Sequence, residues 1–471
     1  MNEQVAANPL GTERVGKLMI RYAIPSIISI VVNSLYNMVD QIFIGQGVGY
    51  LGNAATNIIL PLTSILLALG MMIGDGTASY MSLNLGKGRS QAAAYGVGNA
   101  VTLTVGVSVF LLVLFELFLE PLCHLFGATE GNLPYALEYG SIIVLGFPFA
   151  MIDGAFGSII RADGRPKVSM VGLLIGCITN IILDPIFIFV FRWGMMGAAA
   201  ATVLGQIITA VLAVWYLRHM KAVRLEQSSF RFHGSLAEKY LPLGICSFLS
   251  QISLVMAMAA IQNMTLKYSA VDPIFGQTRY TQIPMAVLGI VMKFFQIVIS
   301  ISVGLAAGCI PVVGYNIGAG RKDRAKSLFT RLLAAETIVG AVALLIVELF
   351  PRQLIGIFGA ANESVYYTEY AVKCFHIYLC MMVLATVNKG TFIYLQSLGR
   401  AFASTAISMV REVLFGVGFA LLLPRWFGLD GVLYSMPVSD LLTFVICVIV
   451  IRYTYKTLDW GEKRRPKVET S

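Results

Sequence analysis

The sequence has 471 residues, of which 57% are hydrophobic and only 13% charged, and its mean hydropathy is +0.77. This composition excludes a soluble enzyme, a disordered scaffold and a small disulfide-stapled domain, and the long non-alternating apolar runs exclude an outer-membrane barrel. The hydrophobic residues suffice for about twelve bilayer spans of roughly 22 residues each. The net charge of +9 then raises the question of where the basic residues lie.

Apolar runs that are long enough to cross a bilayer recur along the whole chain. They start near Leu18, Gly52, Ala92, Leu133, Val168 and Met196 in the first half, and near Tyr240, Thr281, Ala325, Ser364, Phe402 and Gly431 in the second. The expected fold class is therefore an all-α integral membrane protein with twelve transmembrane helices.

The Lys and Arg residues fall mainly on one set of loops between these spans. Of the 34 basic residues, 25 lie on the side that holds both termini, 5 lie on the opposite side and 4 fall inside spans. By the positive-inside rule this split places both termini in the cytoplasm of a multi-pass protein. The positive charge is thus a topology signal, and no nucleic-acid partner is expected. The first apolar run is too long for a cleaved signal peptide.

The two halves of the sequence resemble each other at a nearly constant offset. Asn84–Arg89 resembles Asn316–Arg321, 232 residues later, and Gly164-Arg165 resembles Gly399-Arg400. Each repeat holds six spans, an even number, so we expect two parallel six-helix lobes around a central cavity. The expected domains are an N-terminal lobe at 1–225, a cytoplasmic linker at 226–239, a C-terminal lobe at 240–455 and a basic cytoplasmic tail at 456–471.

Polar residues inside the first span follow a helical spacing. Ser26, Ser29, Asn33, Asn37 and Asp40 are separated by steps of 3, 4, 4 and 3 residues, so they share one face of a helix. The stripe ends in a carboxylate at membrane depth, where an ionised group costs several kcal/mol unless it is paired, protonated or hydrated.

Further oxygen-bearing side chains lie in later spans of the same lobe. Asn180 and Asp184 are four residues apart and face the same way, and Thr202 and Asp153 lie in neighbouring spans. With Asp40, these oxygens would suit a proton or a hard cation such as sodium. A structural polar network that joins the helices by hydrogen bonds remains the alternative.

Other residues are candidates for the substrate path and for helix bending. Pro25 and Pro185 each remove a backbone hydrogen bond and could bend their helices. The expected substrate-cavity residues are Asn33, Tyr36, Asn37, Gln206, Gln251 and Met258.

Several intramembrane residues stay undecided. Asp75, between two glycines, suits close hinge packing and function equally. Arg411 and Glu412 are adjacent, face different directions on a helix and are expected to pair with other helices rather than with each other. Four more could line a cavity in the second lobe or neutralise one another: Lys293, Glu336, Lys389 and Asp440.

The seven cysteines lie in or beside apolar spans, and none forms a C-x-x-C motif. We therefore expect buried small hydrophobic side chains rather than a zinc or redox site. No cofactor is expected, apart from a coupling ion, H⁺ or Na⁺.

Four segments together carry a resemblance to a known family: Tyr22–Pro25, Asn37–Gly45, Arg161–Lys167 and Asn180–Pro185. In this order they resemble multidrug and toxic compound extrusion (MATE) transporters, specifically the bacterial branch with DinF-like and MepA-like pumps. The resemblance runs from about Leu18 to Tyr455.

The resemblance implies twelve helices in two lobes and export of cationic lipophilic compounds against a proton or sodium gradient. It also implies a first-lobe ion site, to which Asp40, Asn180, Asp184 and Thr202 would correspond. The NorM-like branch also uses carboxylates in the seventh and tenth spans, whereas the tenth span here offers Asn388 and Lys389. This departure favours an ion site in the first lobe.

The expected function is therefore multidrug efflux, and thus antibiotic resistance, by a monomeric antiporter in a bacterial-type inner (plasma) membrane. The expected partners are cationic amphipathic small molecules and membrane lipid. The chain would be a secondary transporter with rocker-switch alternating access, not an enzyme. Protonation of the Asp40–Asp184 pair would release the cationic drug and let the first helix repack at Pro25. The alternative is a flippase for lipid-linked oligosaccharide or lipid in the same superfamily, which should have a strongly cationic cavity.

Overall fold

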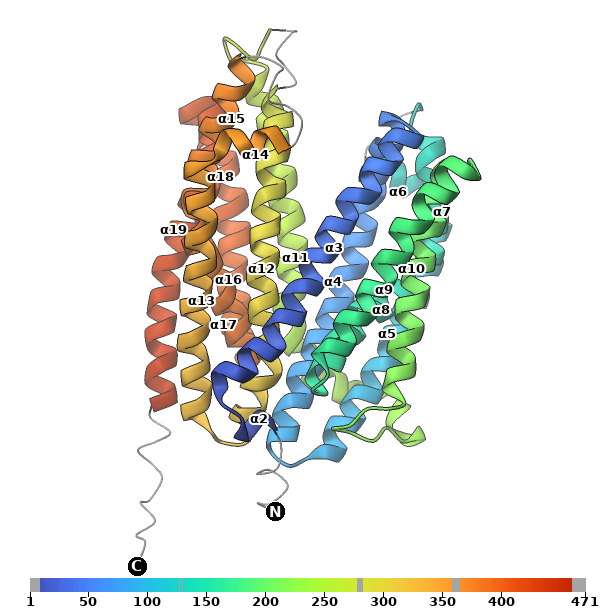
Figure 1. Cartoon of the computed structure of the whole chain (residues 1–471), viewed down its shortest axis with the longest axis vertical. Coiled ribbons are helices and arrows are strands. Elements are labelled where there is room, and N and C mark those ends of the chain that lie inside the picture. The colour runs from blue at the N-terminus through green and yellow to red at the C-terminus, as the bar shows by residue number, and fades with distance from the viewer. Residues whose placement is uncertain (1–8, 127, 129, 278–282, 358–364, 460–471) are drawn as a thin grey trace, which may run out of the picture. The chain divides into compact units, whose positions relative to one another are not determined.

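A computed structural model describes residues 9–126, 128, 130–277, 283–357 and 365–459, and within them helices form nearly all of the regular structure (Figure 1). The chain divides into two compact units. The first comprises the described residues up to Phe248 together with Ala307–Arg321 and Gln396–Ala401. The second comprises Leu249–Ala306, Lys322–Leu395 and the described residues from Phe402 onward. Most of the expected basic tail lies outside the described residues.

The first half of the chain begins with a short helix and continues with long apolar ones. These are α2 (Pro9–Thr12), α3 (Val15–Gly47), α4 (Tyr50–Gly86), α5 (Ser90–Leu117), α6 (Leu119–Leu125), α7 (Leu133–Leu145), α8 (Phe147–Ala162), α9 (Pro166–Pro185), the π-helix η1 (Ile186–Val190), α10 (Gly194–Leu217) and the 3₁₀ turn η2 (Gln227–Phe230).

The second half repeats this pattern. Its helices are α11 (Gly234–Ser269), α12 (Ile283–Gly318), α13 (Lys322–Leu349), α14 (Pro351–Ile357), α15 (Val365–Tyr378), α16 (Met382–Ser397), α17 (Ala401–Met409), the π-helix η3 (Val410–Val417), α18 (Gly418–Leu422) and α19 (Pro424–Asp459). In both halves a π-helix follows the helix that begins after the Gly-Arg turn.

The expected membrane fold is confirmed. In the described residues ten helices are long and apolar enough to cross a membrane, and up to twelve if each of two bent pairs counts as one span. The fourth and tenth expected spans are each formed by a bent pair of helices. α7 and α8 meet at a 54° bend and α15 and α16 at a 45° bend. At the first bend, Gly146 separates the helices and Pro148 lies in the first turn of α8, where its missing N–H costs no helical bond.

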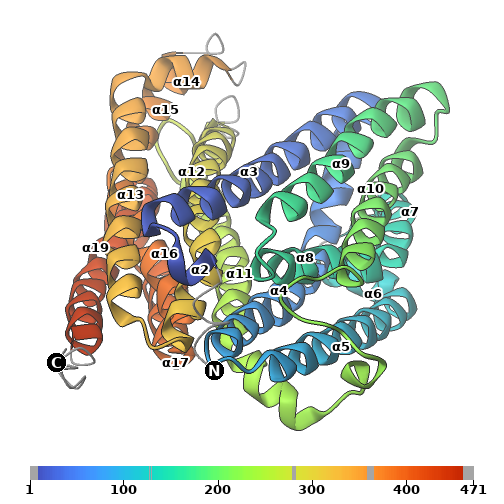
Figure 2. The same cartoon turned by 60° about the horizontal axis from the view of Figure 1, so that its bottom comes forward.

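Within the first unit, α3 lies along α9 in both views (Figures 1 and 2), and α4 packs on α8. This places Asp40 of α3 opposite Asp184 of α9. The buried core of this unit includes Ile59 and Leu66 of α4 and Phe147 and Met151 of α8.

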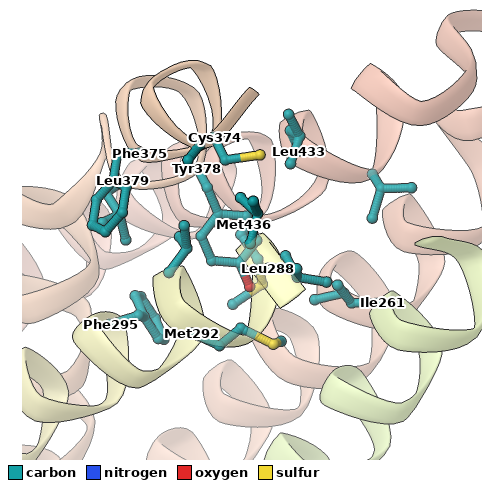
Figure 3. Packing of buried hydrophobic residues seen from close by; sticks show 14 of the residues in the cluster. Ile261, Leu288, Met292, Phe295, Cys374, Phe375, Tyr378, Leu379, Leu433 and Met436 are labelled. Atoms are coloured by element: carbon teal, nitrogen blue, oxygen red, sulfur yellow. The ribbon is translucent and has the colours of Figure 1, made fainter. Parts of the chain in front are cut away.

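The core of the second unit gathers methionine and aromatic side chains (Figure 3). The Tyr378 ring lies among Leu288, Met292 and Met436, and it makes an edge-to-face contact with Phe295 at 6.1 Å between ring centroids. Thioethers fill irregular gaps around aromatic rings well, which explains why methionines concentrate here.

The segment between Leu217 and α11 is hydrogen-bonded to other parts of the first unit. Thr102 Oγ1 donates to Phe230 O at 2.7 Å, and Asn99 Nδ2 donates to His233 O at 3.2 Å. Asp163, in the turn before α9, accepts from the backbone N–H groups of Lys221 and Ala222. Burial raises the pKa of Asp163 above its ordinary value, although these bonds oppose the shift. The expected linker therefore begins with a segment that is fixed to one unit.

Helices α4 and α11 approach so closely in the first unit that glycine is required. A Cβ at Gly244 would overlap Met72 O and lie 3.0 Å from Gly76 N. We expect Gly244→Ala to force the helices apart and to lower the free energy of unfolding by about 1–3 kcal/mol, the usual cost of overpacking. Thermal unfolding of the purified protein in detergent measures this.

Gly106→Ala is the matched control for this prediction, because a Cβ there meets no atom within 4 Å. Alanine favours a helix over glycine by about 1 kcal/mol, so this variant should melt at or slightly above the wild-type temperature. Equal melting temperatures for the two variants would contradict the close approach.

Candidate functional site

Four of the predicted ion-site residues lie together inside the first unit. Asp40 comes from α3, Asn180 and Asp184 from α9, and Thr202 from α10. Asn180 Nδ2 donates to Asp184 Oδ1 at 3.3 Å and to Thr202 Oγ1 at 3.2 Å. The Asp40 and Asp184 carboxyl groups face each other within interaction range. Asp184 is 0% exposed and Asp40 7%.

The cluster has spare coordinating capacity. One oxygen each of Asp40, Asn180 and Asp184 has no hydrogen-bond partner among the described residues. Two facing carboxylates in a low dielectric repel each other strongly unless a proton or cation lies between them. Carboxylate, amide and hydroxyl oxygens suit both H⁺ and a hard cation such as Na⁺. The arrangement is thus chemically able to bind either ion.

Two tyrosines flank the cluster. The Tyr36 hydroxyl contacts Thr202, and Tyr139 of α7 lies close to Asp40, Asp184 and Tyr36. Tyr36 is among the substrate-cavity residues expected from the sequence, although its position four residues before Asp40 puts both on one helical face. Tyr139 was missed, because it is on another helix and has no spacing that points to the cluster.

The rest of the α3 stripe is mostly occupied by its own backbone. Ser26 Oγ and Ser29 Oγ donate to the carbonyls four residues earlier, at 3.0 and 2.8 Å. Asn37 Nδ2 donates to Asn33 O at 2.7 Å, and both asparagines are exposed. α3 begins at Val15, so Pro25 lies inside the helix rather than at its start. Its ring cannot donate a hydrogen bond there, which leaves this point of α3 weakened.

The remaining predicted residues are distributed as follows. Gln206 is half-buried on α10 of the first unit, whereas Gln251 and Met258 belong to the second. Met258 lines a small apolar pocket there with Phe295, Tyr378 and other residues. Pro185 is the last residue of α9 and directly precedes the π-helix η1.

Asp153 belongs to a different polar network. It lies beside Arg161, whose Nη2 donates to Ser158 Oγ at 2.7 Å. Ser158 Oγ donates to Asp75 Oδ1 at 2.6 Å, and Ser247 Oγ donates to Asp75 Oδ2 at 2.8 Å. The structure therefore places Asp153 within electrostatic range of Arg161, whose bond to Ser158 leads on to Asp75. Asp75 joins α4, α8 and α11 by hydrogen bonds.

The second unit holds a buried ion network. Arg411 Nη1 contacts Glu412 Oε1 at 2.6 Å, and Arg411 Nε contacts Asp440 Oδ1 at 2.8 Å. Lys389 Nζ lies 3.4 Å from Glu412 Oε1. We call these four residues the charge tetrad; its formal charges sum to zero. Lys293 is exposed.

The mutual Arg411–Glu412 contact corrects the expectation that these neighbours would pair only with other helices. Both lie in the π-helix η3, whose wider turn departs from α-helical spacing. The long Arg411 side chain reaches Glu412 with one nitrogen and Asp440 of α19 with another.

Comparison with known proteins places the chain in a family. The MatE family model matches residues 25–186 and 258–422, more than half of the chain. The multidrug export protein MepA of Staphylococcus saprophyticus is 25% identical, over 92% of this chain and 93% of MepA. MepA of Staphylococcus aureus strain MSSA476 is 22% identical, over 92% and 93%.

Solved structures share the fold. An outward-facing multidrug resistance MATE family transporter superposes with a TM-score of 0.87 at 21% identity, covering 97% of this chain and 99% of the other. A MOP superfamily transporter from Pyrococcus furiosus also gives 0.87 at 21% identity, covering 98% and 99%. With its helical membrane fold and the match of the family model, the chain belongs to the MatE family of multidrug and toxic compound extrusion transporters.

Proposed function

We propose that this chain exports cationic amphipathic compounds in exchange for protons or sodium ions, and that Asp40, Asn180, Asp184 and Thr202 form its coupling site. The observation that carries the proposal is the pair of buried carboxyl groups that face each other on α3 and α9, with oxygens that lack partners among the described residues. An intramembrane carboxyl pair of this kind is by default functional.

Coupling would come from mutual exclusion. The ionised pair attracts a lipophilic cation, whereas the ion-loaded pair does not, so that drug and coupling ion bind in alternation. Binding of the coupling ion would also remove the repulsion between the carboxylates of α3 and α9. α3 is weakened at Pro25, where its backbone hydrogen bonding is interrupted. The two ion states would therefore favour different packings of α3, as alternating access requires.

The proposed setting follows from charge and hydropathy. The basic loops favour a bacterial-type inner (plasma) membrane topology with both termini in the cytoplasm. The proposed transporter works as a monomer, with membrane lipid around it.

Ethidium movement in proteoliposomes tests this function. We expect purified protein to move ethidium under a pH gradient without sodium, under a sodium gradient at clamped pH, or under both, and the active gradient identifies the ion. Protein-free liposomes are the control. Folded protein that moves no ethidium under either gradient would contradict the proposal and make lipid-linked substrates the next to test.

A further inference from the structure

Among the described residues of the second unit, one buried carboxyl group has no cationic partner. Glu336 lies in the middle of α13 and is 0% exposed, and neither of its carboxyl oxygens has a hydrogen-bond partner among the described residues. The other two carboxyl groups buried with it in this unit, Glu412 and Asp440, both have cationic partners. Glu336 is therefore the exception that calls for a physical explanation.

The carboxyl group sits in a place that the packing leaves for it. A Cβ at Gly390 of α16 would come within 2.8 Å of Glu336 Cγ and 3.0 Å of Oε1. One turn after Glu336 on α13, glycine also faces α16: a Cβ at Gly340 would come within 2.6 Å of Thr386 Oγ1. Thr386 Oγ1 also donates to the Glu336 carbonyl at 2.9 Å. α13 and α16 thus cross closely, and glycine at position 390 makes room for the carboxyl group.

No charge compensates this group in the described part of the chain. The Ser302 hydroxyl of α12 lies beside it but donates to Thr386 O at 3.3 Å. On α15, His376 pairs with Glu348, which lies twelve residues, or about 18 Å, along α13 from Glu336. On α19, Asp440 is itself a carboxylate, and Arg411 already binds it. An isolated carboxylate in such a place is costly, and a neutral carboxyl group avoids this cost.

We propose that Glu336 is a second proton-binding residue of the transport cycle, protonated in this conformation and deprotonated in another. In the second conformation its O–H bond breaks, the proton passes to water and the carboxylate remains. Lys389 is the available counter-ion, since it precedes Gly390 on α16 and its 3.4 Å contact with Glu412 is the longest in the charge tetrad. This inference rests on the proposed function, because it adds a proton to the same cycle.

Labelling with dicyclohexylcarbodiimide tests the inference independently of transport. This apolar reagent modifies protonated carboxyl groups, and peptide mass spectrometry of the full-length protein in proteoliposomes locates the label. We expect Glu336 to be labelled, with a labelled fraction that falls as pH rises and changes when ethidium is added. Glu348, exposed on the same helix, is the matched site that should stay unlabelled. A Glu336 that is unlabelled at every pH, or labelled to a constant fraction, would show a permanently sequestered group and overturn the proposal.

Glu336→Gln, with Glu348→Gln as its control, extends the test to coupling. The amide keeps the size of the side chain but cannot exchange a proton. We expect gradient-driven ethidium flux to fall at least about fivefold, the lower end of typical coupling between sites, and its pH dependence to flatten. Flux and pH profile equal to those of the control would count against Glu336. If the wild-type protein itself moves no ethidium, the proposed function fails, while the labelling result still decides whether Glu336 titrates.

Discussion

Asp184→Asn should reduce gradient-driven ethidium export by about 100-fold, towards the upper end of the coupling free energies of about 1–3 kcal/mol found between sites. Asparagine has nearly the same shape, and its amide oxygen can still accept the bond from Asn180 Nδ2 that now measures 3.3 Å. It cannot bind and release a proton, and it brings no negative charge to a cation. The loss should therefore arise from coupling and not from folding. Initial rates of ethidium movement under an imposed gradient measure it.

Asp430→Asn is the matched control. Asp430 is exposed on α19 and bonds Lys373 Nζ at 2.6 and 2.7 Å. An exposed ion pair contributes at most about 1 kcal/mol, so this variant should export at the wild-type rate. Normal export by a well-expressed Asp184→Asn protein would refute the coupling role.

The double variant sharpens the test of a shared site. If Asp40 and Asp184 act as one ion-binding pair, Asp40→Asn alone should abolish coupling, and adding it to Asp184→Asn should reduce export no further. Residues that act as a unit are strongly non-additive in this way. Independent, multiplying losses would indicate that the two carboxyl groups serve separate steps.

Much of the first-unit site could be predicted because helical spacing is visible in a sequence. Asn180 and Asp184 are four residues apart, and the α3 stripe leads directly to Asp40. Polar side chains in an apolar span have to face protein or water. The polar residues of neighbouring spans in one lobe are therefore expected to face each other in its interior. The structure places these residues together, whereas their coupling role stays a prediction.

The contacts of Asp153 and of the charge tetrad depend on distances between helices, which residue spacing within one helix does not reveal. Asp153 was grouped with Asp40 from the sequence, and the charge that acts on it in the structure is Arg161, two turns along the same helix. A sequence also cannot show which of several buried charges meet. Lys389 and Asp440 join the charge tetrad while Glu336 does not, although all were equal candidates. The π-helical turn at η3 decides the Arg411 contacts, and α-helical periodicity does not predict it.

Arg411→Met should produce the largest loss of stability in the second unit, about 3–5 kcal/mol, the usual effect of removing one partner from a buried ion pair. Arg411 is 4% exposed and bonds both Glu412 and Asp440. Without Arg411, the two buried carboxylates share a single cation, Lys389. Its contact with Glu412, at 3.4 Å, is longer than either contact of Arg411. Chemical or thermal unfolding of the purified protein in detergent measures the loss.

Combining Arg411→Met with Asp440→Leu should restore part of this stability, because the uncompensated carboxylate disappears and Glu412 keeps Lys389. Replacing a whole buried pair by apolar side chains is often neutral or stabilising, which is why breaking a pair and deleting it have different effects. Arg425→Met, at an exposed position of α19, is the matched control and should change the free energy of unfolding by less than about 0.5 kcal/mol. A double variant no more stable than Arg411→Met would mean that Asp440 does not depend on Arg411, and the tetrad would then not act as one electrostatic unit.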